Sequence, residues 1–179
     1  MKQALLVIDV QAALCSGPWA AFEAGAMIER INIVSARARE AGVPVVLIQH
    51  EADDDTLAHA SPGWQLAPGL VSAASDERLR KTASDSFHNT DLQSLLGRLQ
   101  ADSLVVCGLQ TDFCVDTTVR RALGLGYPVT LVSDGHSTTD NAVLPAAQII
   151  AHHNVTLANL DSFGPRVQLA AAIDIRFAV

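Results

Sequence analysis

Hydrophobic and polar residues follow two alternating patterns along most of the chain. Short apolar runs rich in branched side chains predict buried strands, and they occupy residues 4–10, 43–49, 103–108 and 128–133. Segments with apolar residues at every third or fourth position predict amphipathic helices, and they occupy residues 22–41, 113–125 and 142–153. The chain is therefore expected to alternate between strands and helices.

Weaker patterns predict the remaining elements. Residues 77–81 form a short candidate strand, and residues 155–158 form a candidate last strand. Thr90 and Gln93 have the spacing of a capping box, which predicts a helix with a leucine stripe between Leu92 and Leu99. These segments continue the alternation of strands and helices toward the end of the chain.

Alternating strands and helices build successive βαβ units, which form a parallel sheet covered by helices. We therefore expect a single α/β domain over residues 1–179: a three-layer doubly wound sheet, mostly parallel, with about six strands and helices on both faces. Residues 50–74 have no period, which predicts a long loop acting as a lid or pocket wall. The tail from Asp161 onward has no assigned element. Ligands bind at the carboxyl ends of the strands in such sheets, so function is expected there.

Composition narrows the class of protein. Of the 179 residues, 49% are hydrophobic and 17% are charged, which excludes a disordered chain, and 4% aromatics leave an aliphatic core suited to a parallel sheet. The formal net charge of −7 provides no cationic surface for nucleic acid. No apolar run approaches the roughly 20 residues of a spanning helix, and Met1-Lys2-Gln3 leads into a strand-like segment that does not resemble the apolar region of a signal peptide. A soluble, cytoplasmic protein without membrane partners is expected.

Three ionisable residues fall at the carboxyl ends of predicted strands. Asp9 ends the first strand, Lys81 ends the short strand, and Cys114 follows the strand at 103–108. A lysine beside Asp9 and Cys114 would stabilise both a carboxylate and a thiolate, which is a catalytic arrangement. Each residue also has an ordinary explanation: Asp9 as a cap of a loop N–H, Lys81 as a solvated surface lysine, and Cys114 as a small buried apolar side chain.

Cys114 has the most specific surroundings of the three cysteines. It lies where the chain leaves a strand and enters a helix, so the helix dipole and free N–H groups would lower the pKa of the thiol and stabilise an oxyanion. The odd number of cysteines and the lack of a C-x-x-C pair argue against a disulfide framework and a cysteine zinc site. Cys107 fits the core, and Cys15 has no identifiable partner.

The motifs around these positions resemble those of the isochorismatase-like cysteine hydrolases. The similarity is carried by ALLVIDVQ at 4–11, by Lys81 with the following Ser86-Phe87 and Thr90-Asp91-Leu92, by VVCGLQTDFCVDTTVRRALGLGY at 105–127 and by VTLVSDGHSTTD at 129–140. It covers nearly the whole chain, from the first strand to about residue 140 and more loosely to the last strand.

The resemblance implies a catalytic triad of Asp9, Lys81 and Cys114. In the family, the Asp takes the thiol proton, the thiolate attacks a carbonyl carbon, and water later hydrolyses the thioester. The resemblance also implies a cis peptide between Leu109 and Gln110, with the backbone N–H groups of Gln110 and Cys114 forming the oxyanion hole. The family often assembles into dimers or larger rings, so a homo-oligomer is expected.

The sequence departs from the nicotinamidase branch of the family, which carries an Asp-x-His metal motif. Here the corresponding stretch begins His50-Glu51-Ala52, which leaves His50, Asp53 and His59 as candidate ligands. A carboxylate-rich loop is more often simply solvated, so no metal is expected. No phosphate loop or dinucleotide fingerprint is present, so no cofactor is expected either.

True isochorismatases hydrolyse a vinyl ether and tend to lack the cysteine at this position. The retained Cys114 therefore favours a hydrolase that cleaves the C–N bond of a small amide. One alternative is an isochorismatase-type ether hydrolase with Asp9 as the acid. Another is a non-hydrolytic binding protein of the same fold, in which Cys114 senses oxidants.

Aromatic and histidine residues give the remaining candidates. Trp64, Phe87 and Phe113 are candidate substrate-binding residues, with core packing as the alternative for each. His136 is expected to form structural hydrogen bonds, because the chain has no G-x-S-x-G elbow for it to serve.

Overall fold

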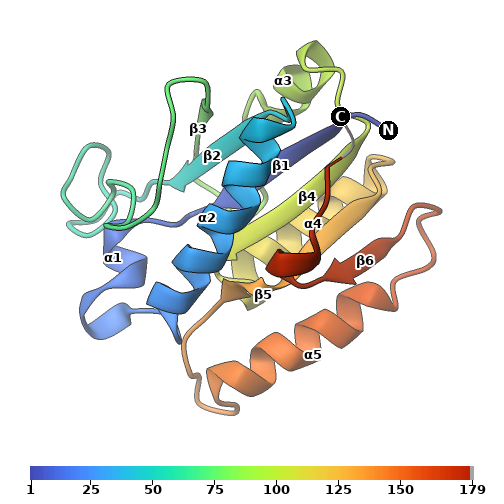
Figure 1. Ribbon diagram of the computed structural model, residues 1–179. Coiled ribbons are helices and arrows are strands. Elements are labelled where there is room, and N and C mark those ends of the chain that lie inside the picture. Colours follow the sequence, from blue (N-terminus) through green and yellow to red (C-terminus); the bar gives the residue numbers. More distant parts are fainter. Residues whose placement is uncertain (178–179) are drawn as a thin grey trace.

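Six strands form one parallel sheet in the computed structural model, which describes residues 1–177 (Figure 1). The strands are β1 (Gln3–Ile8), β2 (Val45–His50), β3 (Glu77–Lys81), β4 (Ser103–Leu109), β5 (Val129–Ser137) and β6 (Val167–Ala170). They lie in the order β3-β2-β1-β4-β5-β6, and all five pairings are parallel. The expected doubly wound α/β sheet is confirmed.

Helices cover both faces of this sheet. The helices and short turns are α1 (Ala12–Cys15), η1 (Gly17–Trp19), α2 (Ala24–Glu40), α3 (Leu92–Arg98), η2 (Thr111–Val115), α4 (Asp116–Gly124), α5 (Ala146–Ala158) and η3 (Ala172–Asp174). α2 and η3 pack on one face, and α3 and α4 pack on the other, which Leu157 of α5 also joins. Figure 1 shows α2 crossing one side of the sheet. Within residues 1–177, no helix is long and apolar enough to cross a membrane.

The inner strands bury both faces because they are apolar at almost every position. In β1, Leu5 and Val7 pack with residues of α2, whereas Leu6 and Ile8 pack with residues of α3 and α4. All four side chains are at most 2% exposed. Burying a side chain of this kind contributes roughly 1.5–3 kcal/mol, so the aliphatic runs supply the core that the scarce aromatic residues do not.

The order of the strands changes direction between β1 and β4. From β1 the chain moves outward through β2 to β3, and it then returns to place β4 on the other side of β1. Connections that leave two neighbouring strands in opposite directions open a crevice above their carboxyl ends, where ligands bind in this class of sheet. Asp9 directly follows β1, and the segment with Cys114 follows β4.

The end of the chain differs from its prediction. Residues 155–158, expected as the last strand, are the final turn of α5, in which Leu157 is buried and Val155 is 62% exposed. Alternation over so short a span does not distinguish a strand from a helix. α5 begins at Ala146, four residues later than expected, and the last strand is β6, in the tail that had no assigned element.

The start of α3 also differs from its prediction. The helix begins at Leu92 with Asp91 at its N-cap, so the capping box of Thr90 and Gln93 is wrong. The Thr90 hydroxyl donates to the Ser86 carbonyl oxygen at 2.6 Å and accepts from the Leu92 N–H at 3.3 Å. A hydroxyl can donate and accept at once, so Thr90 bonds the first residue of the helix from a position one residue before the N-cap.

Candidate active site

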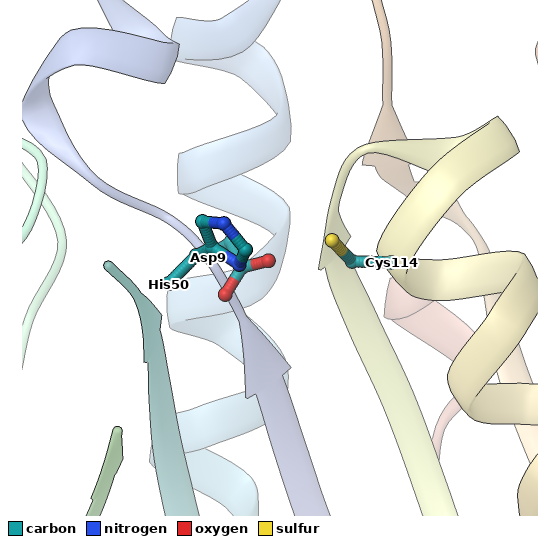
Figure 2. Close-up of side chains that lie close together, drawn as sticks. All are labelled: Asp9, His50 and Cys114. Carbon is teal, nitrogen blue, oxygen red and sulfur yellow. The ribbon is translucent and has the colours of Figure 1, made fainter. Parts of the chain in front are cut away.

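Four neighbouring strands bring polar side chains to one point at the carboxyl edge of the sheet. Lys81 is the last residue of β3, His50 is the last residue of β2, and Asp9 follows β1. Cys114 lies in η2, the π-helical turn that follows β4. Figure 2 shows the Cys114 sulfur facing Asp9 and His50 across the gap between the strand ends. The strand order β3-β2-β1-β4 thus assembles residues that lie far apart in the sequence.

The Lys81 side chain is fully buried and paired with Asp9. Its Nζ lies 2.7 Å from Asp9 Oδ2, and the two side chains are 0% and 1% exposed. The same Nζ donates to the Ala83 carbonyl oxygen at 3.0 Å and lies 3.2 Å from His50 Nδ1. Buried charges need such additional hydrogen bonds to offset their desolvation. Lys81 is therefore not the solvated surface lysine that was its alternative explanation.

Asp9 leaves one of its carboxylate oxygens free. Its backbone φ is 53°, in the left-handed region that Asp tolerates better than most residues, while its N–H still donates to the Ile48 carbonyl oxygen at 2.9 Å. Asp9 Oδ1 is buried and has no hydrogen-bond partner within residues 1–177. A buried oxygen without a partner carries a desolvation cost, so it is poised to accept a proton or a hydrogen bond.

The Cys114 thiol lies close to this carboxylate. One Asp9 oxygen, one His50 ring nitrogen and Cys114 Sγ all lie within 4.8 Å of one another. Burial and the negative charge of Asp9 raise the pKa of Cys114 to about 11, against the opposing effect of Lys81. The expected lowering of this pKa is therefore wrong, because the helix-dipole argument left out burial and the neighbouring carboxylate. The resting thiol keeps its proton at neutral pH.

Two contacts from the end of β5 hold the η2 turn in place. His136 Nε2 lies 3.0 Å from Asn154 Oδ1, which can only accept, so the ring proton is on Nε2. His136 Nδ1 then accepts from the Thr111 hydroxyl at 2.9 Å, and the Thr138 hydroxyl donates to the Asp112 carboxylate at 2.6 Å. Burial lowers the pKa of His136 to about 4, so this histidine is neutral and forms the structural hydrogen bonds expected of it.

The backbone before Cys114 has the arrangement that the family resemblance implied. The peptide bond between Leu109 and Gln110 is cis. The Gln110 carbonyl oxygen accepts hydrogen bonds from the N–H groups of Phe113 and Val115, both at 3.1 Å, which closes the turn around Cys114. An oxyanion hole formed by the N–H groups of Gln110 and Cys114 stays a prediction.

The three candidate pocket aromatics do not come together. Phe87 is 8% exposed and stacks on Tyr127 in the core, with ring centroids 6.2 Å apart, so core packing explains it. Trp64 lines a cleft of about 870 Å³ along the edge strand β3. Phe113 is 55% exposed and directly precedes Cys114. Phe113 is therefore the aromatic residue of the three that lies in the same turn as the thiol.

The long loop between β2 and β3 folds back against the segment after β1. The Ala12 N–H donates to the Gln65 carbonyl oxygen at 2.8 Å, and the Ala67 N–H donates to the Val10 carbonyl oxygen at 2.9 Å. Residues 64–66 of this loop line the 870 Å³ cleft. The loop therefore forms a pocket wall, which is one of the two roles expected for it.

The candidate metal ligands of this loop do not gather into one site. Asp53 and His59 are exposed, and neither belongs to the cluster at the strand ends. His50 instead groups with Asp9, in a set of donors of the kind that divalent ions use. The Lys81 ammonium already bonds both of these residues, so it supplies the positive charge at this point.

His50 is the site residue whose place the sequence reasoning missed. The parallel register of β2 and β3 pairs it with Lys81, and Asp9 lies on its other side. Burial and the Lys81 charge lower the pKa of His50. Its position at the end of a buried strand, like those of Asp9 and Lys81, was the signal that pointed to it.

Sequence comparisons relate the chain to known hydrolases. Residues 3–157 match the family model of the isochorismatase domain. A streptothricin hydrolase of Streptomyces noursei is 40% identical over 150 residues, which cover 83% of this chain and 53% of that protein. The chain thus spans about half the length of that relative. The ureidoacrylate amidohydrolase RutB of Cronobacter sakazakii (strain ATCC BAA-894) is 29% identical over 191 residues, covering 86% of this chain and 81% of that protein.

A comparison of structures agrees with the sequence matches. The crystal structure of an isochorismatase family protein has a TM-score of 0.87 to this chain and is 35% identical in sequence. The match covers 95% of this chain and 98% of the other. The resemblance inferred from the sequence motifs is therefore confirmed.

Proposed function

Because the chain belongs to the isochorismatase family of hydrolases, we propose that it is a cysteine hydrolase that cleaves the C–N bond of a small amide through an acyl-thioenzyme intermediate. One observation carries the proposal: Asp9, whose Oδ1 is buried and unpartnered within residues 1–177, belongs to the same cluster as the Cys114 thiol. A thiol that keeps its proton at rest needs a base at the moment of attack, and this carboxylate is that base.

The first half-reaction forms a thioester. The thiol proton passes to Asp9 Oδ1 as Cys114 Sγ attacks the amide carbonyl carbon, and the carbonyl oxygen becomes an oxyanion. The backbone N–H groups of Gln110 and Cys114 stabilise this oxyanion. When the intermediate collapses, the C–N bond breaks and the protonated Asp9 gives its proton to the leaving amine.

The second half-reaction releases the acid. Water gives a proton to the Asp9 carboxylate as its oxygen attacks the thioester carbon, the C–S bond breaks, and the proton returns to the sulfur. One amide and one water thus become one carboxylic acid and one amine. Lys81 keeps its charge throughout, because it stabilises the Asp9 carboxylate and the negative charge that develops on Cys114 Sγ.

The two alternative functions make different use of Cys114. An ether hydrolase of the isochorismatase type would use Asp9 as an acid and leave the thiol idle. A redox sensor works through a reactive thiolate, whereas burial raises the pKa of Cys114. The amide hydrolase is the function in which the carboxylate and the thiol both take part, so it is the one supported best.

The proposal is tested by comparing wild-type protein with the Cys114→Ala variant on a panel of small amides. The panel begins with streptothricin and ureidoacrylate, taken from the names of two relatives. We expect the wild type to hydrolyse at least one amide and the variant to lose about 1,000-fold or more in kcat, because the covalent route is removed. Mass spectrometry of quenched reactions should find the acyl group on the peptide that contains Cys114.

Cys15→Ala is the matched control, because Cys15 is also half-buried but lies outside the cluster. It should keep wild-type activity. Equal amide hydrolysis by the wild type and Cys114→Ala would refute the thiol route. Hydrolysis of an isochorismate-like ether by both proteins would favour the ether hydrolase instead.

A further inference from the structure

All three N–H donors of the Lys81 ammonium group are in use. They reach Asp9 Oδ2 at 2.7 Å, the Ala83 carbonyl oxygen at 3.0 Å and His50 Nδ1 at 3.2 Å. An ammonium group donates hydrogen bonds and cannot accept them, so His50 Nδ1 is the acceptor of this bond. The proton of the neutral imidazole is therefore on Nε2.

The surroundings keep the imidazole in this neutral form. Burial and the charge of Lys81 lower the pKa of His50, against the opposing effects of the Asp9 charge and the Ala83 carbonyl oxygen. Protonating Nδ1 would also break the bond to Lys81 and place two cations 3.2 Å apart. His50 Nε2–H is thus a permanent donor at neutral pH.

This donor points out of the sheet. His50 is half-buried at the end of β2. Figure 2 shows one ring nitrogen next to the Asp9 carboxylate and the other pointing away from the strand ends. The nitrogen next to Asp9 is Nδ1, because Lys81 bonds both groups at once. Nε2 is therefore the outward nitrogen.

The other three side chains of the site have no donor to spare. Lys81 uses all three N–H groups, the Asp9 carboxylate can only accept, and the Cys114 proton is the one transferred in the reaction. A substrate with a second oxygen beside its scissile amide brings an acceptor that none of these groups serves. His50 Nε2–H is the donor that remains for it.

We propose that His50 orients the substrate by donating its Nε2–H to a carbonyl or carboxylate oxygen next to the scissile amide, while its Nδ1 holds Lys81. The inference rests on the proposed function. One His50 ring nitrogen lies within 4.8 Å of Cys114 Sγ, so the imidazole borders the thiol that attacks the scissile amide. The preferred substrates are accordingly small amides with a second carbonyl group close to the first.

The first test needs no substrate. Nitrogen-15 NMR of histidine-labelled protein at pH 7 should show His50 with Nε2 protonated and Nδ1 unprotonated, the signals being assigned by their loss in His50→Gln. His136 provides an internal reference, because its contact with Asn154 also places the proton on Nε2. A protonated Nδ1, or a doubly protonated ring, would overturn the inference whatever the protein hydrolyses.

The second test combines two variants with two substrates. Gln can accept from Lys81 and donate outward, whereas Leu has a similar size and does neither. For an amide with a second carbonyl, His50→Leu should raise KM roughly 10-fold and His50→Gln much less. For the analogue with a methylene group in place of that carbonyl, the rise in KM caused by His50→Leu should be clearly smaller, because the analogue offers no oxygen to the imidazole N–H. An equal rise in KM for both substrates would overturn the contact.

Alkylation of Cys114 by iodoacetamide across pH separates substrate binding from damage to the triad. An unchanged alkylation profile with a raised KM supports the substrate contact. An altered profile in His50→Leu without a substrate-dependent KM overturns it and leaves His50 as a positioning residue for Lys81. His152→Leu, at an exposed histidine of α5, is the control and should change neither measurement. Equal activities of wild type and Cys114→Ala would instead defeat the proposed function, and the NMR result would still decide the tautomer.

Discussion

Two buried polar networks flank the turn that carries Cys114, and they are built differently. On one side, Lys81 and Asp9 form an ion pair at 2.7 Å. On the other side, Thr111, His136 and Asn154 form a chain of neutral hydrogen bonds. Each network contains a histidine whose pKa is lowered by burial: His50 beside the ion pair, and His136 in the neutral chain.

The difference lies in what each network leaves unsatisfied. Both ring nitrogens of His136 have partners, and the Asn154 amide also donates to the Ser133 carbonyl oxygen at 2.9 Å. The ion pair instead leaves Asp9 Oδ1 buried and unpartnered within residues 1–177. In a purely structural network, every buried polar atom has a hydrogen-bond partner. A network that transfers a proton needs an acceptor atom that is free to receive it. We therefore interpret the neutral network as a brace and the charged network as the site of the proposed chemistry.

Breaking the charged network should have the largest effect. Lys81→Met keeps the length of the side chain but leaves the Asp9 carboxylate buried without a counter-ion. We expect the free energy of unfolding to fall by about 3–5 kcal/mol, and amide hydrolysis to fall at least about 1,000-fold. Urea denaturation and steady-state kinetics measure the two effects. Arg80→Met is the matched control, since its ion pair with Glu51 is exposed and contributes about 0–1 kcal/mol. Equal losses of stability and activity in Lys81→Met and Arg80→Met would contradict the role assigned to the buried ion pair of Lys81 and Asp9.

Asp9→Asn should separate thiol acidity from catalysis. The negative charge of Asp9 adds to burial in raising the pKa of Cys114, so removing it should lower that pKa below the wild-type value. Amide hydrolysis should nevertheless fall roughly 1,000-fold, because the base is lost. Alkylation rates across pH report the first effect and kcat the second. If the thiol pKa does not fall in Asp9→Asn, the charge of Asp9 does not affect the pKa of Cys114.

The neutral network should fail in acid. His136 has a folded pKa of about 4, below its ordinary value of 6.5, so the unfolded chain binds the proton more readily. About 3 kcal/mol of stability, present above pH 6.5, should therefore be lost as the pH falls toward 4. Urea denaturation at pH 7 and pH 4.5 measures the loss. His136→Leu should be less stable at pH 7 and less sensitive to acid, and an undiminished acid sensitivity in that variant would assign the effect to other groups.

The smallest effect is expected at the second contact of the η2 turn. Thr138→Val keeps the shape of the side chain but removes the hydrogen bond to the Asp112 carboxylate. This should reduce the free energy of unfolding by about 1.5–3 kcal/mol and lower kcat slightly, because the turn with Cys114 loosens. Thr139→Val is the neighbouring control. If both variants behave like the wild type, the Thr138 contact does not position the turn.

The sequence predicted the interior of the sheet and three of the residues at its edge. Aliphatic runs such as 4–10 and 103–108 favoured buried strands, which placed Asp9 and Cys114 at or after strand ends, and the weaker pattern at 77–81 placed Lys81 at another. Their meeting depends on the strand order, which local patterns do not contain. The family resemblance supplied that step.

Long-range geometry explains what the sequence did not predict. The pKa of Cys114 is raised by burial and by the charge of Asp9. Neither effect can be recognised from the residues next to Cys114 in the sequence. His50 was read with Asp53 and His59 because they are close in sequence, whereas the β2–β3 register pairs it with Lys81. Residues 155–158 were misassigned because four residues span barely one helical turn, which is too short for periodicity to distinguish a helix from a strand.

The proposed catalytic cation, Lys81, belongs to one of the two edge strands of the sheet. β3 lies at the edge, and Lys81 is its one buried residue. Edge strands open locally at a lower cost than central ones, so β3 can detach while the other five strands stay folded. Each opening withdraws the ammonium from Asp9 and His50. Mild heat or denaturant should therefore inactivate the protein before it unfolds, and the amide protons of β3 should exchange with solvent sooner than those of β1. We therefore expect the temperature at which activity is lost to be set by local opening of β3 and not by the free energy of global unfolding.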